Sequence, residues 1–117
     1  MKSYRLEDLE TFQLSMTLAD EIWEIVTKWN FLAVDTVGKQ IIRSSDSIAA
    51  NIAEGYGRYH FKENRNFCFY SRGSVLETKT WLMKARNRKL ITTQKFEKLF
   101  KFNFKYLLLH MLRLRSA

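Results

Sequence analysis

The chain has 117 residues, of which 46% are hydrophobic, 15% aromatic and 27% charged, so it has the composition of one folded domain and not of a disordered segment. The net charge of +8 is unevenly divided, because residues 1–57 carry five Lys/Arg and nine Asp/Glu, whereas residues 58–117 carry fifteen and three. This asymmetry predicts either self-association between unlike surfaces or a polyanionic ligand for the second half.

The absence of proline and the spacing of apolar residues predict a helical chain throughout. A first helix is expected over about residues 6–29 and a second over about 35–54, with Asp35 as its N-cap or first-turn acid. Expected core residues of the first are Leu9, Phe12, Met16, Ala19, Trp23 and Val26; those of the second are Val37, Ile41, Ser44, Ile48 and Ile52.

A third helix is expected over about 60–87 and a fourth over about 93–114, with Thr92 as N-cap and Ile91 and Phe96 as a hydrophobic staple. Expected inward residues of the third are Phe67, Tyr70, Ser74, Trp81 and Ala85; those of the fourth are Phe96, Phe100, Leu107, Met111 and Leu114. Short connections predict an all-α, antiparallel up-down-up-down four-helix bundle that spans residues 1–117 as one domain.

Small side chains dominate the second helix. They are Ser44, Ser45, Ser47, Ala49, Ala50 and Ala53. This pattern predicts close approach of a neighbouring helix, with Gly73 and Ser74 as the expected counterpart. Gly55 and Gly57 are expected to form the C-terminal cap and turn, which is favoured over a nucleotide-binding loop because no strand precedes them and no Gly-Lys-Ser/Thr follows.

Three stretches carry a family resemblance, namely "YRLEDLETFQLS", "QIIRSSDSIAANIAEGYGR" and "FYSRGSVLETKTWL". They resemble the bacterial four-helix bundle proteins called 23S ribosomal RNA intervening sequence proteins. The residues taken as its structural motif are Asn51, Glu54, Gly55, Tyr56, Gly57, Arg72 and Gly73. That family is in turn similar to the accessory variability determinant of diversity-generating retroelements, a ring-forming basic bundle that binds nucleic acid and a reverse transcriptase.

The resemblance implies a homopentameric ring and leaves the activity undefined. A second apolar arc on the fourth helix supports self-association independently, because one bundle core cannot bury both arcs. The interface candidates on this arc are Phe102, Tyr106, Leu109 and Leu112. The alternative is that these side chains lie against loops of the same chain.

A basic stripe runs along the third helix, where Lys or Arg recurs every seven residues from Arg58 to Arg86. Such a stripe could bind phosphates without reading sequence, or could pair with the acidic first helix of the same or a neighbouring subunit. The nucleic-acid-binding candidates are Arg58, Lys62, Arg65, Lys79, Arg86, Arg88, Lys89, Lys98, Lys101 and Lys105.

Catalytic chemistry is not predicted. His60 has Glu54 and Glu63 nearby but no nucleophile or phosphate loop, and His110 lies among apolar residues. Cys68 is single and no metal-binding spacing occurs, so neither a disulfide nor a metal or other cofactor is expected. Because no signal peptide or membrane span is recognisable, a cytoplasmic protein without membrane contact is expected. The leading interpretation is an RNA- or DNA-binding assembly, and the alternative is a scaffold that binds another protein.

Overall fold

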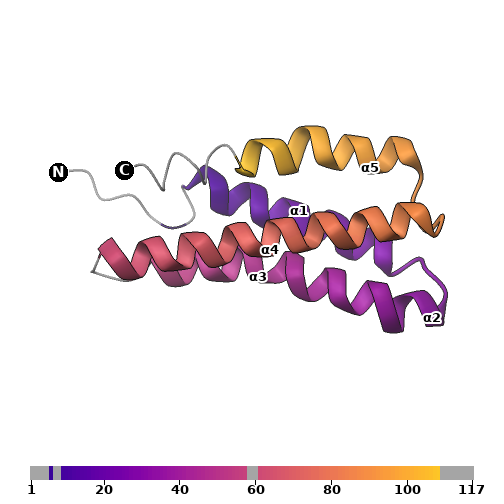
Figure 1. The fold of residues 1–117 in the computed structure, drawn as a ribbon, viewed down its shortest axis with the longest axis horizontal. Helices are drawn as coiled ribbons and strands as arrows, with labels where there is room; N and C mark the ends of the chain where they lie inside the picture. The colour runs from indigo at the N-terminus through magenta and orange to yellow at the C-terminus, as the bar shows by residue number, and fades with distance from the viewer. Residues whose placement is uncertain (1–5, 7–8, 58–60, 109–117) are drawn as a thin grey trace.

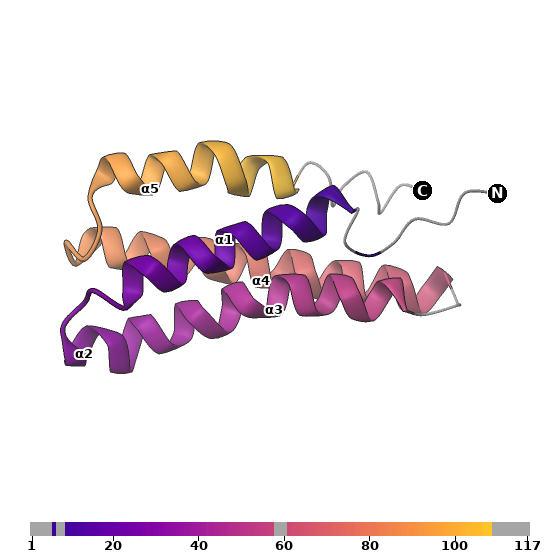
Figure 2. The same cartoon turned by 180° about the vertical axis from the view of Figure 1, so that it is seen from behind.

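The computed structural model describes residues 6, 9–57 and 61–108, and at 61–64, 102 and 103 only the backbone is described. Four long helices lie side by side along the long axis of the molecule (Figures 1 and 2). The α1–α2 and α4–α5 connections lie at one end of the bundle, and the end of α3 and the start of α4 lie at the other (Figure 1). No strand occurs among the described residues, so the expected all-helical bundle is confirmed.

Helix α1 (Glu10–Val26) buries a different stripe from the predicted one. The buried residues are Thr11, Ser15, Leu18, Ile22 and Val26. Met16 and Trp23, expected inside, are 47% and 53% exposed, so that part of the prediction is wrong. The Ser15 hydroxyl donates to the Thr11 carbonyl at 2.6 Å, and this local bond lets a polar side chain take a core position that a count of apolar residues misses.

The second long helix begins four residues earlier than predicted. It comprises α2 (Phe31–Ala33), the π-helical segment η2 (Val34–Gly38) and α3 (Lys39–Tyr56). Asn30 is the cap, because its Oδ1 accepts the Ala33 N–H at 3.0 Å. Asp35 therefore lies inside the helix, where its Oδ1 is 3.5 Å from Lys39 Nζ. The five predicted core residues of this helix are all buried, which confirms its inward face.

Gly38 allows α1 and the second long helix to approach closely. A Cβ atom at this position would lie 2.7 Å from Val26 Cγ1 and 3.1 Å from the Ala33 carbonyl oxygen. Since Val26 is itself buried, its side chain has no open space into which it could move.

Hydroxyl groups line the contact between α3 and α4 (Phe61–Asn87), the most extensive helix pair of the bundle. Ser47 Oγ lies 2.7 Å from Ser74 Oγ, and Thr78 Oγ1 lies 2.8 Å from Ser44 Oγ. The Ser71 hydroxyl donates to the Ile48 carbonyl at 3.0 Å. The small residues of α3 thus face small polar residues of α4, as predicted for Ser74.

The buried face of α4 is rotated from the predicted one. It consists of Ser71, Val75, Thr78, Leu82 and Ala85. Tyr70 is 57% exposed and Gly73 is exposed with no atom within 4 Å of an added Cβ, so both predicted packing roles are wrong. Gly73 and Ser74 were expected opposite the small residues of α3, and the structure places Ser71, Ser74 and Thr78 there instead of Gly73.

The end of α3 matches the expected cap only at Gly57. Gly57 is the C-cap residue, and its N–H bonds to the Ala53 carbonyl at 3.1 Å. Gly55 is buried within the last turn of the helix instead of lying in the turn that follows. The φ of Gly57 is −77°, so this end uses no left-handed residue.

The last helix comprises α5 (Thr93–Leu99), the π-helical segment η3 (Phe100–Phe104) and residues 105–108. Thr92 is the N-cap as predicted, because its Oγ1 accepts the Lys95 N–H at 3.1 Å. Ile91 and Phe96, expected to form a staple, are both buried.

A Schellman motif ends α4. Leu90 N–H bonds to the Ala85 carbonyl at 2.8 Å, and Lys89 N–H bonds to the Arg86 carbonyl at 3.0 Å. Lys89 occupies the left-handed position of this motif with φ 62°. Glycine is the usual residue there because it has no Cβ to clash.

Gly38→Ala is expected to lower the free energy of unfolding by about 1–3 kcal/mol, since the new methyl group overpacks the contact with Val26. The measurement is chemical denaturation. Gly57→Ala is the matched control, because a Cβ there meets only ordinary contacts at 3.7 Å. Equal stability of the two variants would contradict the close approach at Gly38.

Lys89→Gly is expected to raise the free energy of unfolding by about 1 kcal/mol, because glycine removes the strain of the left-handed backbone. Lys89→Ala, which removes the same charge but keeps a Cβ, is expected to give no such gain. A thermal melt compares the three proteins, and a similar rise in Tm for both variants would assign the gain to charge instead.

Candidate nucleic-acid interface

A lysine stripe lies on the outer side of the last helix. Lys98, Lys101 and Lys105 are spaced by three and four residues and are all exposed. The opposite side of the helix is fixed in the core by Phe96, Leu99, Phe104 and Leu107, which are buried. None of the three lysines has an ion-pair partner within the part of the chain that the structure describes. This helix therefore presents three ammonium groups to solvent from a packed support.

The α4–α5 connection adds two exposed cations, Arg88 and Lys89. The Schellman motif fixes the backbone here, and α5 begins only four residues after Lys89. The connection thus leads directly into the helix that carries the lysine stripe, and we call Arg88, Lys89, Lys98, Lys101 and Lys105 the lysine surface.

Two other predicted cations are engaged within the chain. Lys79 Nζ lies 4.4 Å from the centre of the Phe100 ring, and the Arg86 guanidinium carbon lies 4.3 Å from that of Phe96. The two rings stack on each other with their planes 5° apart. These cation–π contacts join α4 to the last helix. The sequence shows that Lys79 and Arg86 are seven residues apart and that the two phenylalanines are four apart. It does not show that each cation contacts one of the rings.

The remaining predicted cations lie along α4 or outside the described residues. Arg65 is exposed and Arg72 is half-buried. The side chain of Lys62 and the whole of Arg58 lie outside what the structure describes. The heptad stripe is therefore not one uniform surface, because its members differ in exposure and in contacts.

Among the motif residues of α3, one forms a bond within its own helix and two are exposed. The Asn51 side-chain amide donates to the Ser47 carbonyl at 2.9 Å, while Glu54 and Tyr56 are exposed on the last turns. Among the interface candidates, Tyr106 is 38% exposed and its hydroxyl donates to Glu10 Oε1 at 2.6 Å. The Phe102 side chain, Leu109 and Leu112 lie outside the described part of the chain.

Two acidic residues lie close together where α1 meets α3. Partial burial raises the pKa of the Asp46 carboxyl, and the charge of Asp20 on α1 raises that pKa further. Helix α1 contains Glu10, Asp20, Glu21 and Glu24 but no Lys or Arg. The division of charge seen in the sequence is thus a division between helices.

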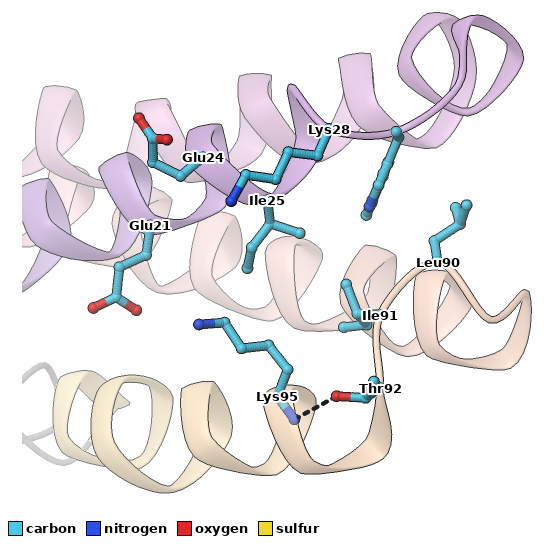
Figure 3. Close-up of a pocket in the computed structure, with 9 residues that line it drawn as sticks. Glu21, Glu24, Ile25, Lys28, Leu90, Ile91, Thr92 and Lys95 are labelled. Carbon is cyan, nitrogen blue, oxygen red and sulfur yellow. Dashed lines mark hydrogen bonds between the residues drawn. The ribbon is translucent and has the colours of Figure 1, made fainter.

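A hollow of about 570 Å³ lies between the end of α1 and the start of α5 (Figure 3). Ile25, Trp29, Leu90 and Ile91 contribute apolar lining. The side chains of Lys28 and Lys95 extend along it with Ile25 between them (Figure 3). The remaining lining residues are Glu21, Glu24 and Thr92, and the Thr92 hydroxyl is used as a helix cap. Its mixed charge favours no one class of ligand.

Neither a metal centre nor a membrane segment emerges from the described residues. Among them, no three His, Cys, Asp or Glu side chains form a group suited to a metal ion. No helix in that same part of the chain combines the length and apolar character needed to cross a bilayer.

Comparison with known proteins gives a family and a fold. The family described as 23S rRNA-intervening sequence protein matches residues 7–105. A solved structure from Bacteroides thetaiotaomicron VPI-5482, described as a protein of unknown function from the S23 ribosomal protein family, superposes with a TM-score of 0.81. The two chains are 20% identical, and the match covers 92% of this chain and 99% of the other. No curated protein matches the chain.

Asp46→Asn is expected to raise Tm at pH 7. A carboxyl whose pKa is raised on folding binds its proton more tightly in the folded state, so stability falls as pH rises from its ordinary pKa of 3.8 through the raised value. The gain in Tm should therefore shrink toward pH 3.5. Asp35→Asn, which removes an exposed ion pair, is the control, and an equal gain there would contradict the prediction.

Proposed function

The chain belongs to the family of 23S rRNA-intervening sequence proteins, and from this premise we propose that it is a non-catalytic, self-assembling four-helix bundle that binds RNA or DNA through a basic surface. The proposed unit is an up-down-up-down bundle in the cytoplasm, and the proposed assembly is a homopentameric ring. The order of the helices and the placement of their connections at alternate ends support the topology (Figure 1).

The lysine surface is the observation that carries this proposal. Three exposed lysines at helical spacing face solvent from a well-packed helix, and two exposed cations of the adjoining connection extend the array. Regularly spaced phosphates bind such an array by releasing condensed counterions. Ammonium groups contact phosphates as point charges, so this array favours binding that is largely independent of base sequence.

The cation–π contacts narrow the proposed surface. Lys79 and Arg86 already contact Phe100 and Phe96, so the proposal gives the main phosphate contacts to the lysine surface and only a supporting part to the α4 stripe. A nucleic acid bound along the last helix could still reach Arg86, which precedes Arg88 by two residues and Lys89 by three.

A protein-binding scaffold is the second candidate function. Its support is the presence of large apolar side chains outside the core, such as Trp23 on α1 and Leu76 on α4. In this alternative the basic surface contacts other subunits or a protein partner, for which the family resemblance suggests a reverse transcriptase.

Simultaneous Lys98→Gln, Lys101→Gln and Lys105→Gln substitution is expected to weaken binding to duplex DNA and structured RNA. For duplex DNA, three lost phosphate contacts should reduce the slope of log K against log salt by about 2.7 per protomer bound. Fluorescence anisotropy across a salt series measures affinity and slope together.

The matched control changes Lys28, Lys39 and Arg43 to Gln, which removes the same charge from exposed positions in the turn after α1 and in α3. Equal loss in both triple variants would assign binding to net charge and not to the lysine surface. No binding by the folded protein at low salt would reject the nucleic-acid proposal and favour the scaffold.

A further inference from the structure

The outer side of α4 carries an apolar stripe that contributes nothing to the core. Leu76 and Met83 are 43% and 39% exposed, and Gly73 and Thr80 continue the stripe at alternating spacings of three and four. This is the spacing of a helix–helix seam, and residues 73–83 extend about 15 Å along the helix. Glycine inside a helix costs about 1 kcal/mol relative to alanine, and among the residues that the structure describes nothing lies near enough to Gly73 to require it.

Helix α1 carries a second stripe of this kind. Met16 and Trp23 are 47% and 53% exposed, and Asp20 lies between them on the same side. The buried side of α1 already packs against α3 and the last helix. Two bulky apolar side chains are thus exposed to solvent on a helix whose opposite side is packed in the core.

The two stripes have opposite electrostatic surroundings. Helix α1 has four acidic residues and no Lys or Arg, whereas α4 has six Lys/Arg and two Glu. On α4, Arg72 immediately precedes the stripe residue Gly73, and the exposed Lys84 immediately follows Met83. On α1, Asp20 lies close enough to Asp46 of α3 to raise the pKa of the Asp46 carboxyl, so a cation from outside would relieve a repulsion there.

The stripes cannot meet within one molecule. Helix α4 lies at the front in Figure 1, and α1 lies at the front after the half-turn to Figure 2, so they occupy opposite sides of the bundle. We propose that the outer side of α1 in one copy packs against the outer side of α4 in a second copy, with Trp23 and Met16 against the Gly73–Met83 stripe. This inference rests on the proposed self-assembly and deepens it by naming the two surfaces.

Contact between unlike surfaces leaves one free stripe at each end of a pair, so further copies can add until a ring closes; the proposed ring requires a rotation between neighbours that closes. Pairing of like stripes is disfavoured by charge, because α4 against α4 would bring two basic helices together and α1 against α1 two acidic ones. Packing of α1 against α4 of a second copy is therefore favoured over a twofold dimer in which two α1 helices or two α4 helices pair.

The test uses one variant for each side of the contact, Trp23→Glu and Leu76→Glu, and measures mass by light scattering. Both residues are exposed, so the core is unchanged, and circular dichroism verifies folding. Each variant alone is expected to be monomeric at concentrations at which the unmodified protein assembles, with at least a 30-fold weaker association. Phe31→Glu and Leu32→Glu, at exposed apolar residues of α2, are the matched controls and should assemble normally.

A mixture of the two variants provides the decisive measurement. The intact α1 side of Leu76→Glu and the intact α4 side of Trp23→Glu should form a one-to-one dimer and nothing larger. A dimer formed by Trp23→Glu alone would indicate α4–α4 pairing and overturn the inference. Normal assembly of both variants would also overturn it while leaving self-assembly intact, whereas a monomeric unmodified protein would reject self-assembly itself.

If either glutamate variant loses helical structure, Met16→Gln and Met83→Gln replace the pair, since they change the same two stripes at exposed methionines without adding charge. The same one-to-one dimer is expected from their mixture. Unaltered assembly of both glutamine variants, alone and mixed, would count against the proposed contact.

Discussion

The close contact between α3 and α4 is the constraint on which the rest of this bundle depends. Its serines and threonines form hydrogen bonds across and along the seam, from Ser44–Thr78 to Ile48–Ser71. Because buried hydroxyls require partners, this network fixes how far α4 is rotated and shifted against α3. That rotation directs Lys79 and Arg86 toward the last helix and Leu76 and Met83 toward solvent.

Charge and packing are separated by the same geometry. The rings of Phe96 and Phe100 on the last helix contact two cations of α4, so aromatic faces join these two helices. The lysine stripe of the last helix is exposed to solvent. Acidic residues gather on α1, on the opposite side of the bundle from α4. One small domain thereby carries exposed lysines on its last helix and exposed apolar stripes on α1 and α4, helices of opposite net charge.

The positions of the helices could be predicted from the sequence, but for α1 and α4 the side that faces the core could not. In α3, aliphatic residues and serines repeat on one side only, so its core positions were predicted correctly. In α1 and α4 two sides carry apolar residues, so the count of apolar residues does not show which side faces the core. The side that is buried contains Ser15, Ser71 and Thr78, whose hydroxyls form hydrogen bonds within their own helix or with α3. For the interface, the lysines were predicted one by one, but the Lys79–Phe100 and Arg86–Phe96 pairs depend on the α4–α5 packing.

The hydrogen bond between Tyr106 and Glu10 joins residues 96 positions apart. During synthesis on the ribosome, α3 and α4 are complete before the last helix emerges, and their short connection lets them pair first. Until Tyr106 is available, the apolar residues of α1 that face the last helix stay uncovered. The open side of the first three helices can therefore close only after the last helix has been synthesised.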